Sequence, residues 1–452
     1  MLGREPELRV LETKWARACE GRPQLVAVDG RRRVGKTYLV SSFSCTKPAV
    51  WYGATHEPPA AELARFARAV RQQLGREVEP ILGSSFGSWR SAVRFLGALT
   101  TSAPLIVVLD GFDRLLRSNP EASEVVAHFT EDMPPGARLM LVLVGGRLAD
   151  VLTRAPADVQ ATVLDLDPLD AASARRFLPR LSPAEFLEAY AACGGYPLHL
   201  LQWDQCATTE ENLLQLAGTT GGILLDDGEP MLHDGLPDDA VGYFRILAAV
   251  GRMQTRYSEI QTAADQRIEH PLDMLSRAGL LRRSVPIGAE TSARAAEYEF
   301  TDAYLAFWFR VLYASIPEIE AGQGQRVLQR TRPLWERHIE RVFQDVARQH
   351  ARRLAWSGHV PQNLIIGRWW SAGREHALDV LGMQEGSSLL MGRARWSDAP
   401  LSGEDLVALH GTLNHVPRPA ARPLFALWGR RGVDADVRRA ALGFDAAAAV
   451  GD

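Results

Sequence analysis

The chain has 452 residues, of which 46% are hydrophobic and 23% are charged, a composition typical of globular domains with sizeable cores. Its formal net charge of −3 excludes a strongly basic chain with a global attraction to nucleic acid or to a membrane surface. The length favours about three domains. The longest apolar runs, such as Leu105–Leu109, are too short to cross a bilayer, so we expect no membrane association.

The four cysteines (Cys19, Cys45, Cys193 and Cys206) have no Cys-x-x-Cys spacing. We interpret them as isolated buried thiols, which are typical of a reducing compartment. The N-terminal region also has no signal-peptide core. The sequence therefore predicts a cytoplasmic protein.

The first part of the chain alternates between helical and strand patterns. An amphipathic pattern predicts a helix over residues 3–20, and a second long helix is predicted over residues 59–74. Apolar runs predict five buried strands at Leu25–Asp29, Ala49–Tyr52, Leu105–Asp110, Leu139–Val144 and Ala161–Leu166. This alternation indicates an α/β fold with a parallel sheet, in which ligands bind at the carboxyl ends of the strands.

The strand at Leu25–Asp29 runs directly into a phosphate-binding loop. Gly30 is followed by four residues and then by Gly35, Lys36 and Thr37, which is the P-loop spacing. The glycines let the backbone turn its N–H groups toward phosphates, the lysine supplies a positive charge, and the threonine hydroxyl suits Mg²⁺. We expect ATP and Mg²⁺ as cofactors. The residues predicted to contact the phosphates are Gly30, Arg33, Val34, Gly35, Lys36, Thr37 and Tyr38.

Three further residues are candidates for the chemistry. Asp110 ends a buried strand and is the natural Walker B aspartate, which would complete the magnesium shell with Thr37. The next position, where a glutamate would polarise the attacking water, is Gly111, so we expect slow hydrolysis. Asp113 either replaces that carboxylate or is an ordinary surface turn residue. Arg147 follows another strand and either senses the γ-phosphate or lies on the surface as most arginines do.

The second half of the chain starts with a helical region that is interrupted at residues 194–197. Residues 236–300 then have the outline of a winged helix, with three helices followed by a strand, a loop and a strand. Arg277, Arg282 and Arg283 near the third helix and the wing would suit contact with a DNA backbone, although such modules also dock proteins or pack internally. The alanine-rich tail after Leu442 is predicted to be poorly ordered.

Together these motifs resemble the archaeal-type ATPase family, in the STAND branch of the AAA+-related P-loop NTPases. The resemblance extends along most of the chain. It rests on the following segments: Gly3-Arg4-Glu5, Gly30 to Thr37, the strand ending at Asp110, Leu166 to Leu169, Gly194 to Leu198, and Thr301 to Phe309. The resemblance implies Gly3, Arg4, Glu5, Tyr196 and Pro197 as contacts on the base side of the nucleotide. It also implies a winged helix followed by a domain similar to restriction-endonuclease-like nucleases.

The last domain departs from the nuclease pattern. The nuclease pattern has a glutamate on a helix, and the corresponding residues here are Phe343 and Gln344. The aspartate of the following strand is retained as Asp379. On the next strand, Arg393 and Arg395 replace the glutamate and the lysine of the pattern. Because a nuclease metal site needs two or three carboxylates, we expect no cleavage. The two arginines would form an ion pair with Asp379 or contact phosphate without cutting it.

The sequence thus predicts four domains. These are an ATPase core (1–166), a helical lid (167–235), a winged helix (236–300) and a degenerate nuclease-like domain (301–452). The predicted function is an ATP-binding switch and weak ATPase that couples its ATP or ADP state to domain arrangement. A protein partner or a homo-oligomer would receive the signal. The alternative is a DNA-binding regulator that ATP modulates through the winged helix.

Overall fold

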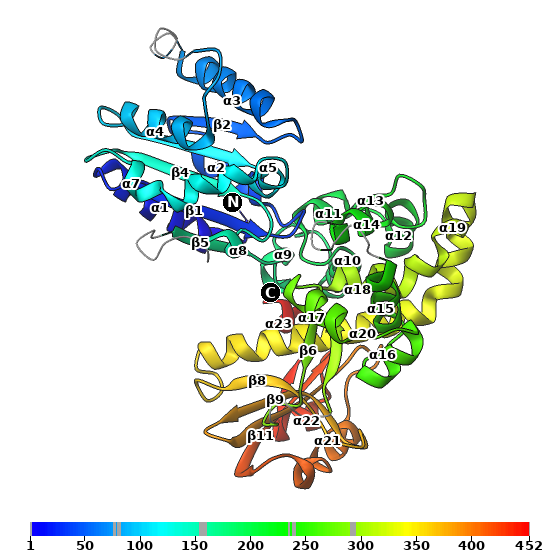
Figure 1. Ribbon diagram of the computed structural model, residues 1–452. Coiled ribbons are helices and arrows are strands. Elements are labelled where there is room, and N and C mark those ends of the chain that lie inside the picture. The colour runs from blue at the N-terminus through cyan, green and yellow to red at the C-terminus, as the bar shows by residue number, and fades with distance from the viewer. Residues whose placement is uncertain are drawn as a thin grey trace. The chain divides into compact units, whose positions relative to one another are not determined.

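The computed structural model describes residues 2–75, 78, 83–152, 161–233, 236, 241–289 and 295–451. The chain forms two compact units, Met1–Asp167 and Pro168–Asp452 (Figure 1). The division into four domains stays a prediction, and its boundary after residue 235 lies outside the described residues. None of the described helices is long and apolar enough to cross a membrane.

Unit 1 contains a five-stranded parallel sheet with the order β2-β3-β4-β1-β5. The strands are β1 (Gln24–Gly30), β2 (Ala49–Gly53), β3 (Leu105–Asp110), β4 (Leu139–Val144) and β5 (Ala161–Leu166). All six residues of the central strand β4 are buried, as expected for a strand with both faces covered. The predicted α/β fold with a parallel sheet is therefore confirmed.

Helices cover both faces of this sheet. The helices of unit 1 are α1 (Glu5–Cys19), α2 (Lys36–Ser44), α3 (Pro59–Leu74), α4 (Trp89–Leu99), α5 (Phe112–Ser118), α6 (Glu124–Ala127), α7 (Phe129–Asp132) and α8 (Ala149–Leu152), with a short 3₁₀ turn η2 (Pro120–Ser123). Helices α3 to α7 pack one large apolar core against alternate residues of β1 to β4. Helices α1 and α2 contact β1, and α1 also contacts β4. This three-layer arrangement leaves the carboxyl ends of the strands as the edge where a ligand would bind.

Unit 2 begins with helices and a small hairpin. The helices are α9 (Ala171–Arg175), α10 (Pro183–Cys193), α11 (Pro197–Gln202), α12 (Thr209–Leu216), α13 (Ile223–Asp226), α14 (Gly228–His233), α15 (Val241–Gly251), α16 (Tyr257–Ala264) and α17 (Glu269–Arg277). The antiparallel strands β6 (Leu281–Ser284) and β7 (Glu297–Phe300) follow them. Three helices and a two-stranded hairpin therefore occupy the region predicted as a winged helix.

A long helix and a second sheet complete unit 2. The helical elements are α18 (Ala303–Phe307), the π-helical turn η3 (Trp308–Leu312), η4 (Tyr313–Ser315), α19 (Ile316–Glu318), η5 (Ile319–Gln323), α20 (Gly324–Trp356), α21 (Gly403–His410), η6 (Leu413–His415), α22 (Ala435–Ala440) and α23 (Ala446–Val450). The strands are β8 (Ile365–Trp370), β9 (Ala377–Gln384), β10 (Ser387–Arg395), β11 (Pro419–Gly429) and β12 (Leu442–Phe444), in the order β12-β11-β10-β9-β8. The 33-residue helix α20 packs on this mixed sheet (Figure 1).

Two expectations about the chain were wrong. The alanine-rich tail is ordered, because Asp445 caps α23 by accepting a 2.8 Å hydrogen bond from Ala448 N. Alanine is the best helix former, and Ala449 and Val450 are buried in unit 2. The cysteines are all free thiols, but only Cys193 is buried, since Cys45 and Cys206 are exposed and Cys19 is intermediate.

Candidate nucleotide site

The loop between β1 and α2 has the backbone shape that a P-loop requires. Gly30, Arg33 and Gly35 have φ angles of 137°, 71° and 96°, in the region that favours glycine. A side chain at Gly30 would also place its Cβ 2.5 Å from the carbonyl oxygen of Leu166 at the end of β5. Val34 is fully buried and anchors the loop to the core. Residues 30–35 therefore turn tightly and lead into the N-terminus of α2.

The two polar residues that start α2 lie at the mouth of this loop. The Lys36 ammonium donates hydrogen bonds of 2.6 Å to Gly30 O and 2.8 Å to Arg31 O. The Thr37 hydroxyl donates a 2.9 Å hydrogen bond to Asp110 Oδ2. Because Thr37 follows β1 and Asp110 ends β3, this bond joins the two halves of the predicted site. A hydroxyl and a carboxylate at this distance are a donor set that fits Mg²⁺.

Strand β4, which lies between β3 and β1 in the sheet, ends beside the same loop. A Cβ built on Gly146 would lie 3.7 Å from Gly30 O, so the segment after β4 adjoins the P-loop. The next residue, Arg147, is exposed and has a φ of 60°, an uncommon conformation for a residue with a side chain. Asp113 in α5 turns back to the end of β4, because its Oδ1 lies 2.6 Å from the position that a Cβ on Gly145 would take. The structure therefore brings Asp113 to the carboxyl edge of the sheet.

Asp29 braces this region, a role that the sequence analysis missed. Its carboxylate is only 7% exposed and accepts a 2.7 Å hydrogen bond from Gly30 N and a 3.0 Å hydrogen bond from Ala149 N. It therefore fixes the start of the P-loop to the segment that carries Arg147. A carboxylate directly before a P-loop glycine was the only sequence signal for this role.

Replacing Asp29 by alanine should leave the two amides of Gly30 and Ala149 without their acceptor. We expect Asp29→Ala to lower the free energy of unfolding by about 1–3 kcal/mol per uncompensated amide, measured by urea denaturation. Asp167→Ala is the matched control, because its side chain is exposed and only its main-chain oxygen is used by Arg4. Equal stability of the two variants would contradict the bracing role.

The N-terminal Gly3-Arg4-Glu5 segment lies next to the P-loop in unit 1. The Arg4 side chain is buried and donates to Val34 O at 3.1 Å and to Asp167 O at 2.6 Å, and it pairs with Glu7 at 3.1 Å. Its guanidinium thus holds the P-loop and the last residue of unit 1. Contact of this segment with the base stays a prediction, as does phosphate contact by Tyr38, whose side chain is 68% exposed.

The other residues predicted on the base side belong to unit 2. Tyr196 is fully buried, with its ring centroid 5.4 Å from His199 and 5.9 Å from Tyr304. Pro197 occupies the first turn of α11, a position that proline favours. Their contact with a nucleotide stays a prediction. The structure adds a packing role for the motif, because Gly195 approaches the backbone of Leu169 closely.

Two of the three arginines predicted to contact DNA, Arg277 and Arg282, already have acidic neighbours. Arg277 pairs with Asp273 at 3.0 Å, and Arg282 lies 3.4 Å from Glu299. Glu269 and Asp273 are both exposed on α17, the helix that would read DNA. This charge distribution does not favour a phosphate backbone, and DNA contact stays a prediction.

The C-terminal sheet corrects part of the nuclease comparison. Arg395 pairs with Asp405 at 2.6 Å and not with Asp379. Asp379 Oδ2 accepts a 3.0 Å hydrogen bond from Ala394 N, and burial raises the pKa of its carboxyl.

The sequence analysis also missed Glu340 of α20, which accepts a 2.8 Å hydrogen bond from Trp396 N. Burial and then the nearby charge of Asp379 raise the pKa of Glu340. No group of three or more metal-binding side chains occurs within the described ranges.

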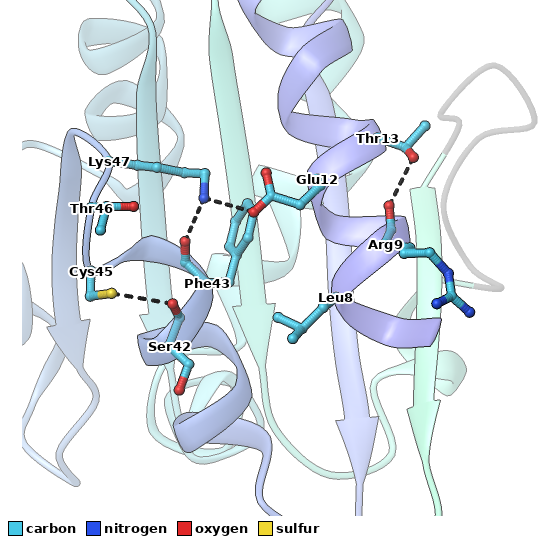
Figure 2. Close-up of a pocket in the computed structure, with 9 residues that line it drawn as sticks. All are labelled: Leu8, Arg9, Glu12, Thr13, Ser42, Phe43, Cys45, Thr46 and Lys47. Atoms are coloured by element: carbon cyan, nitrogen blue, oxygen red, sulfur yellow. Dashed lines mark hydrogen bonds and ion pairs between the residues drawn. The ribbon is translucent and has the colours of Figure 1, made fainter. Parts of the chain in front are cut away.

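A surface pocket of about 630 Å³ lies at the opposite end of α2 from the P-loop (Figure 2). Its walls are Leu8, Arg9, Glu12, Thr13, Ser42, Phe43, Cys45, Thr46 and Lys47. The Lys47 ammonium pairs with Glu12 at 2.9 Å and lies 4.3 Å from the centre of the Phe43 ring, so its charge is already engaged. Since α2 has nine residues at about 1.5 Å each, this pocket is separate from the phosphate loop.

Comparison with known proteins agrees with this geometry. Residues 308–406 match the family DUF234, described as archaeal and bacterial proteins of unknown function. An uncharacterized protein of Methanocaldococcus jannaschii is 22% identical over 412 residues, which cover 87% of each chain. The Walker-type ATPase of Pyrococcus abyssi superposes with a TM-score of 0.51 at 19% identity, over 69% of this chain and 96% of that one. The chain has the P-loop ATPase fold. Its resemblance to the archaeal-type ATPases is confirmed, whereas the nuclease-like domain is not.

Proposed function

We propose that this chain is a magnesium-dependent ATP-binding switch that hydrolyses ATP slowly. The observation that carries the proposal is the 2.9 Å hydrogen bond between the Thr37 hydroxyl and Asp110, next to a correctly shaped P-loop. Thr37 and Asp110 would hold Mg²⁺, which neutralises charge on the phosphates when it is bound. The loop amides and the Lys36 ammonium would hold the phosphates themselves. Arg147 would contact the γ-phosphate.

Slow hydrolysis follows from the residues around Asp110. Gly111 carries no side chain, so no carboxylate directly follows the Walker B aspartate. Asp113 is the candidate replacement, because its carboxylate turns back to the end of β4. Arg117 forms a 3.6 Å ion pair with this carboxylate.

The switch would act through Arg4. Its guanidinium binds both Val34 O in the P-loop and Asp167 O at the end of unit 1. A shift of the loop on phosphate binding would therefore reach the chain that leads into unit 2. A protein partner or a second copy of this chain would respond to the new arrangement.

Calorimetric titration of the full chain with ATP, ADP and GTP tests the proposal, followed by a turnover assay on the same sample. We expect ATP and ADP to bind in a Mg²⁺-dependent manner and more tightly than GTP. Turnover should lie below the range of about 1–10³ s⁻¹ typical of enzymes. Absence of Mg²⁺-dependent ATP binding would refute the proposal.

Removal of the Asp113 charge should slow the residual turnover. We expect Asp113→Asn to lower kcat by about 10²-fold, the lower end of general-base contributions, and to leave ATP affinity unchanged. Arg117→Ala is the control, since it removes the neighbouring cation and keeps the carboxylate. Wild-type kcat in Asp113→Asn would show that Asp113 is a surface turn residue.

A further inference from the structure

The β6–β7 hairpin of the region predicted as a winged helix lies against the C-terminal sheet. Ile287, which follows β6, packs against the apolar core of that sheet, and its N–H donates a 2.9 Å hydrogen bond to Arg368 O of β8. A Cβ built on Gly367 would lie 3.2 Å from Ile287 Cβ, so the two segments approach closely. Just before β7, Ala295 O accepts a 3.1 Å hydrogen bond from the Trp370 indole. Because β8 ends the strand order of its sheet, these contacts occupy the edge of the sheet.

Ion pairs join the hairpin to both the sheet and the long helix α20. Glu299 of β7 pairs with Arg368 of β8 at 3.3 Å and with Arg282 of β6 at 3.4 Å. Arg282 in turn pairs with Asp345 of α20 at 3.3 Å. The side chains of Glu299 and Arg368 are only 12% and 16% exposed. Loss of one partner would therefore leave a charge that has little access to water, which is costly.

The turn between β8 and β9 holds a further part of the predicted winged helix. Its Arg374 pairs with the buried Glu297 of β7 and donates a 3.3 Å hydrogen bond to the Thr255 hydroxyl, just before α16. The Thr255 carbonyl oxygen also accepts a 2.8 Å hydrogen bond from Tyr298 N of β7. Arg374 has a φ of 63°, an uncommon conformation for a residue with a side chain, and these contacts help to offset its cost. One arginine beside the C-terminal sheet therefore binds both β7 and the start of the α16–α17 helix pair.

A wing that binds DNA needs a surface that attracts phosphate groups. In this hairpin, Glu297 and Glu299 instead bind arginines of the C-terminal sheet and its turn. We propose that the β6–β7 hairpin is a docking element whose partner is the C-terminal sheet of the same chain. Helices α15 to α17 and the C-terminal sheet then form one rigid body, and the hairpin does not bind DNA. This docking lies within unit 2 and is independent of ATP binding in unit 1.

A disulfide cross-link in the double variant Ile287→Cys, Gly367→Cys tests whether the hairpin is docked in solution. The 3.2 Å between the two Cβ positions is close to the range of about 3.5–4.5 Å found in disulfides. In the full chain without nucleotide, we expect mild oxidation to link the two cysteines in most molecules, as detected by mass spectrometry of the digested protein. Ile287→Cys combined with Gly403→Cys is the control, because nothing lies within 4 Å of a Cβ built on Gly403. The proposal is wrong if the first pair links no better than the control pair.

Glu299→Gln tests whether the ion pairs hold the two parts together. The change removes the charge that two arginines share. We therefore expect amide hydrogen exchange to become about tenfold faster, and in parallel, in residues 281–289 and in residues 365–370. Arg277→Met is the control, since the exposed pair of Arg277 with Asp273 does not involve the hairpin, and its exchange rates should match those of the unmodified chain. Unchanged exchange in Glu299→Gln, or faster exchange in only one of the two segments, would contradict the docking.

Titration with duplex DNA distinguishes a docking element from a DNA-binding wing that is held back until release. At about 50 mM salt, we expect the unmodified chain, Glu299→Gln and the cross-linked protein to have the same affinity for DNA within about threefold. A clear gain of DNA binding in Glu299→Gln, or its loss in the cross-linked protein, would overturn the proposal.

Discussion

Lys36→Ala is expected to weaken ATP binding by about 100-fold, equivalent to about 2.7 kcal/mol, without lowering the Tm. The lysine is the only cation that the P-loop pattern itself supplies, and a hydrogen bond to a charged group contributes about 1.5–3 kcal/mol. In the structure its ammonium donates hydrogen bonds to the loop carbonyls of Gly30 and Arg31, which lie outside the apolar core. Calorimetric titration with Mg²⁺ and ATP measures the affinity, and thermal unfolding measures the stability.

Lys47→Ala is the matched control for this experiment. Lys36 begins helix α2, and Lys47 lies just after the C-terminal end of the same helix. Lys47 pairs with Glu12 at 2.9 Å. Its removal should leave ATP affinity within twofold of the unmodified chain. If Lys47→Ala weakens binding as much as Lys36→Ala does, the P-loop is not where ATP binds.

Gly195→Ala should destabilise unit 2 by about 3 kcal/mol or more. A Cβ at this position would lie 2.0 Å from Leu169 O and 2.4 Å from Leu169 N, and neither main-chain atom can move away easily. The two residues are also joined by a 2.8 Å hydrogen bond from Leu169 N to Gly195 O. Tryptophan fluorescence during urea unfolding would follow the change, because Trp203 and Trp308 are buried in this unit.

Gly403→Ala is the control for the loss of a glycine, since nothing lies within 4 Å of a Cβ built there. We expect its unfolding midpoint to match that of the unmodified chain. A normal midpoint for Gly195→Ala would mean that the segment 169–195 can separate at little cost. Gly195 would then be required in the motif for contact with a nucleotide and not for packing against Leu169.

The sequence predicted unit 1 well because its signals are local. Buried strands such as Leu105–Asp110 are uninterrupted apolar runs, and the P-loop is a contiguous spacing whose glycines have the expected backbone angles. The meeting of Thr37 and Asp110 could also be expected, since carboxyl ends of parallel strands share one edge of a sheet.

Long-range polar contacts could not be predicted in this way. The bond from Ala149 to Asp29 spans 120 positions of sequence, and the bond from Arg4 to Asp167 spans 163. A single sequence carries no pattern for such pairs. Glu340 was missed for a different reason. The helix glutamate of the nuclease pattern was expected at Phe343-Gln344, which lies about one turn after Glu340 on α20. The alanine-rich tail was misread because composition does not reveal that Asp445 caps its helix.

A crystal structure of the chain with Mg²⁺ and a non-hydrolysable ATP analogue tests the central claim most directly. We predict phosphate density over the amides of residues 31–36, with the Lys36 ammonium moved from Gly30 O and Arg31 O onto phosphate oxygens. The metal should separate the Thr37 hydroxyl from Asp110. Well-ordered analogue bound elsewhere, with the hydrogen bonds of Lys36 and Thr37 unchanged, would contradict the account.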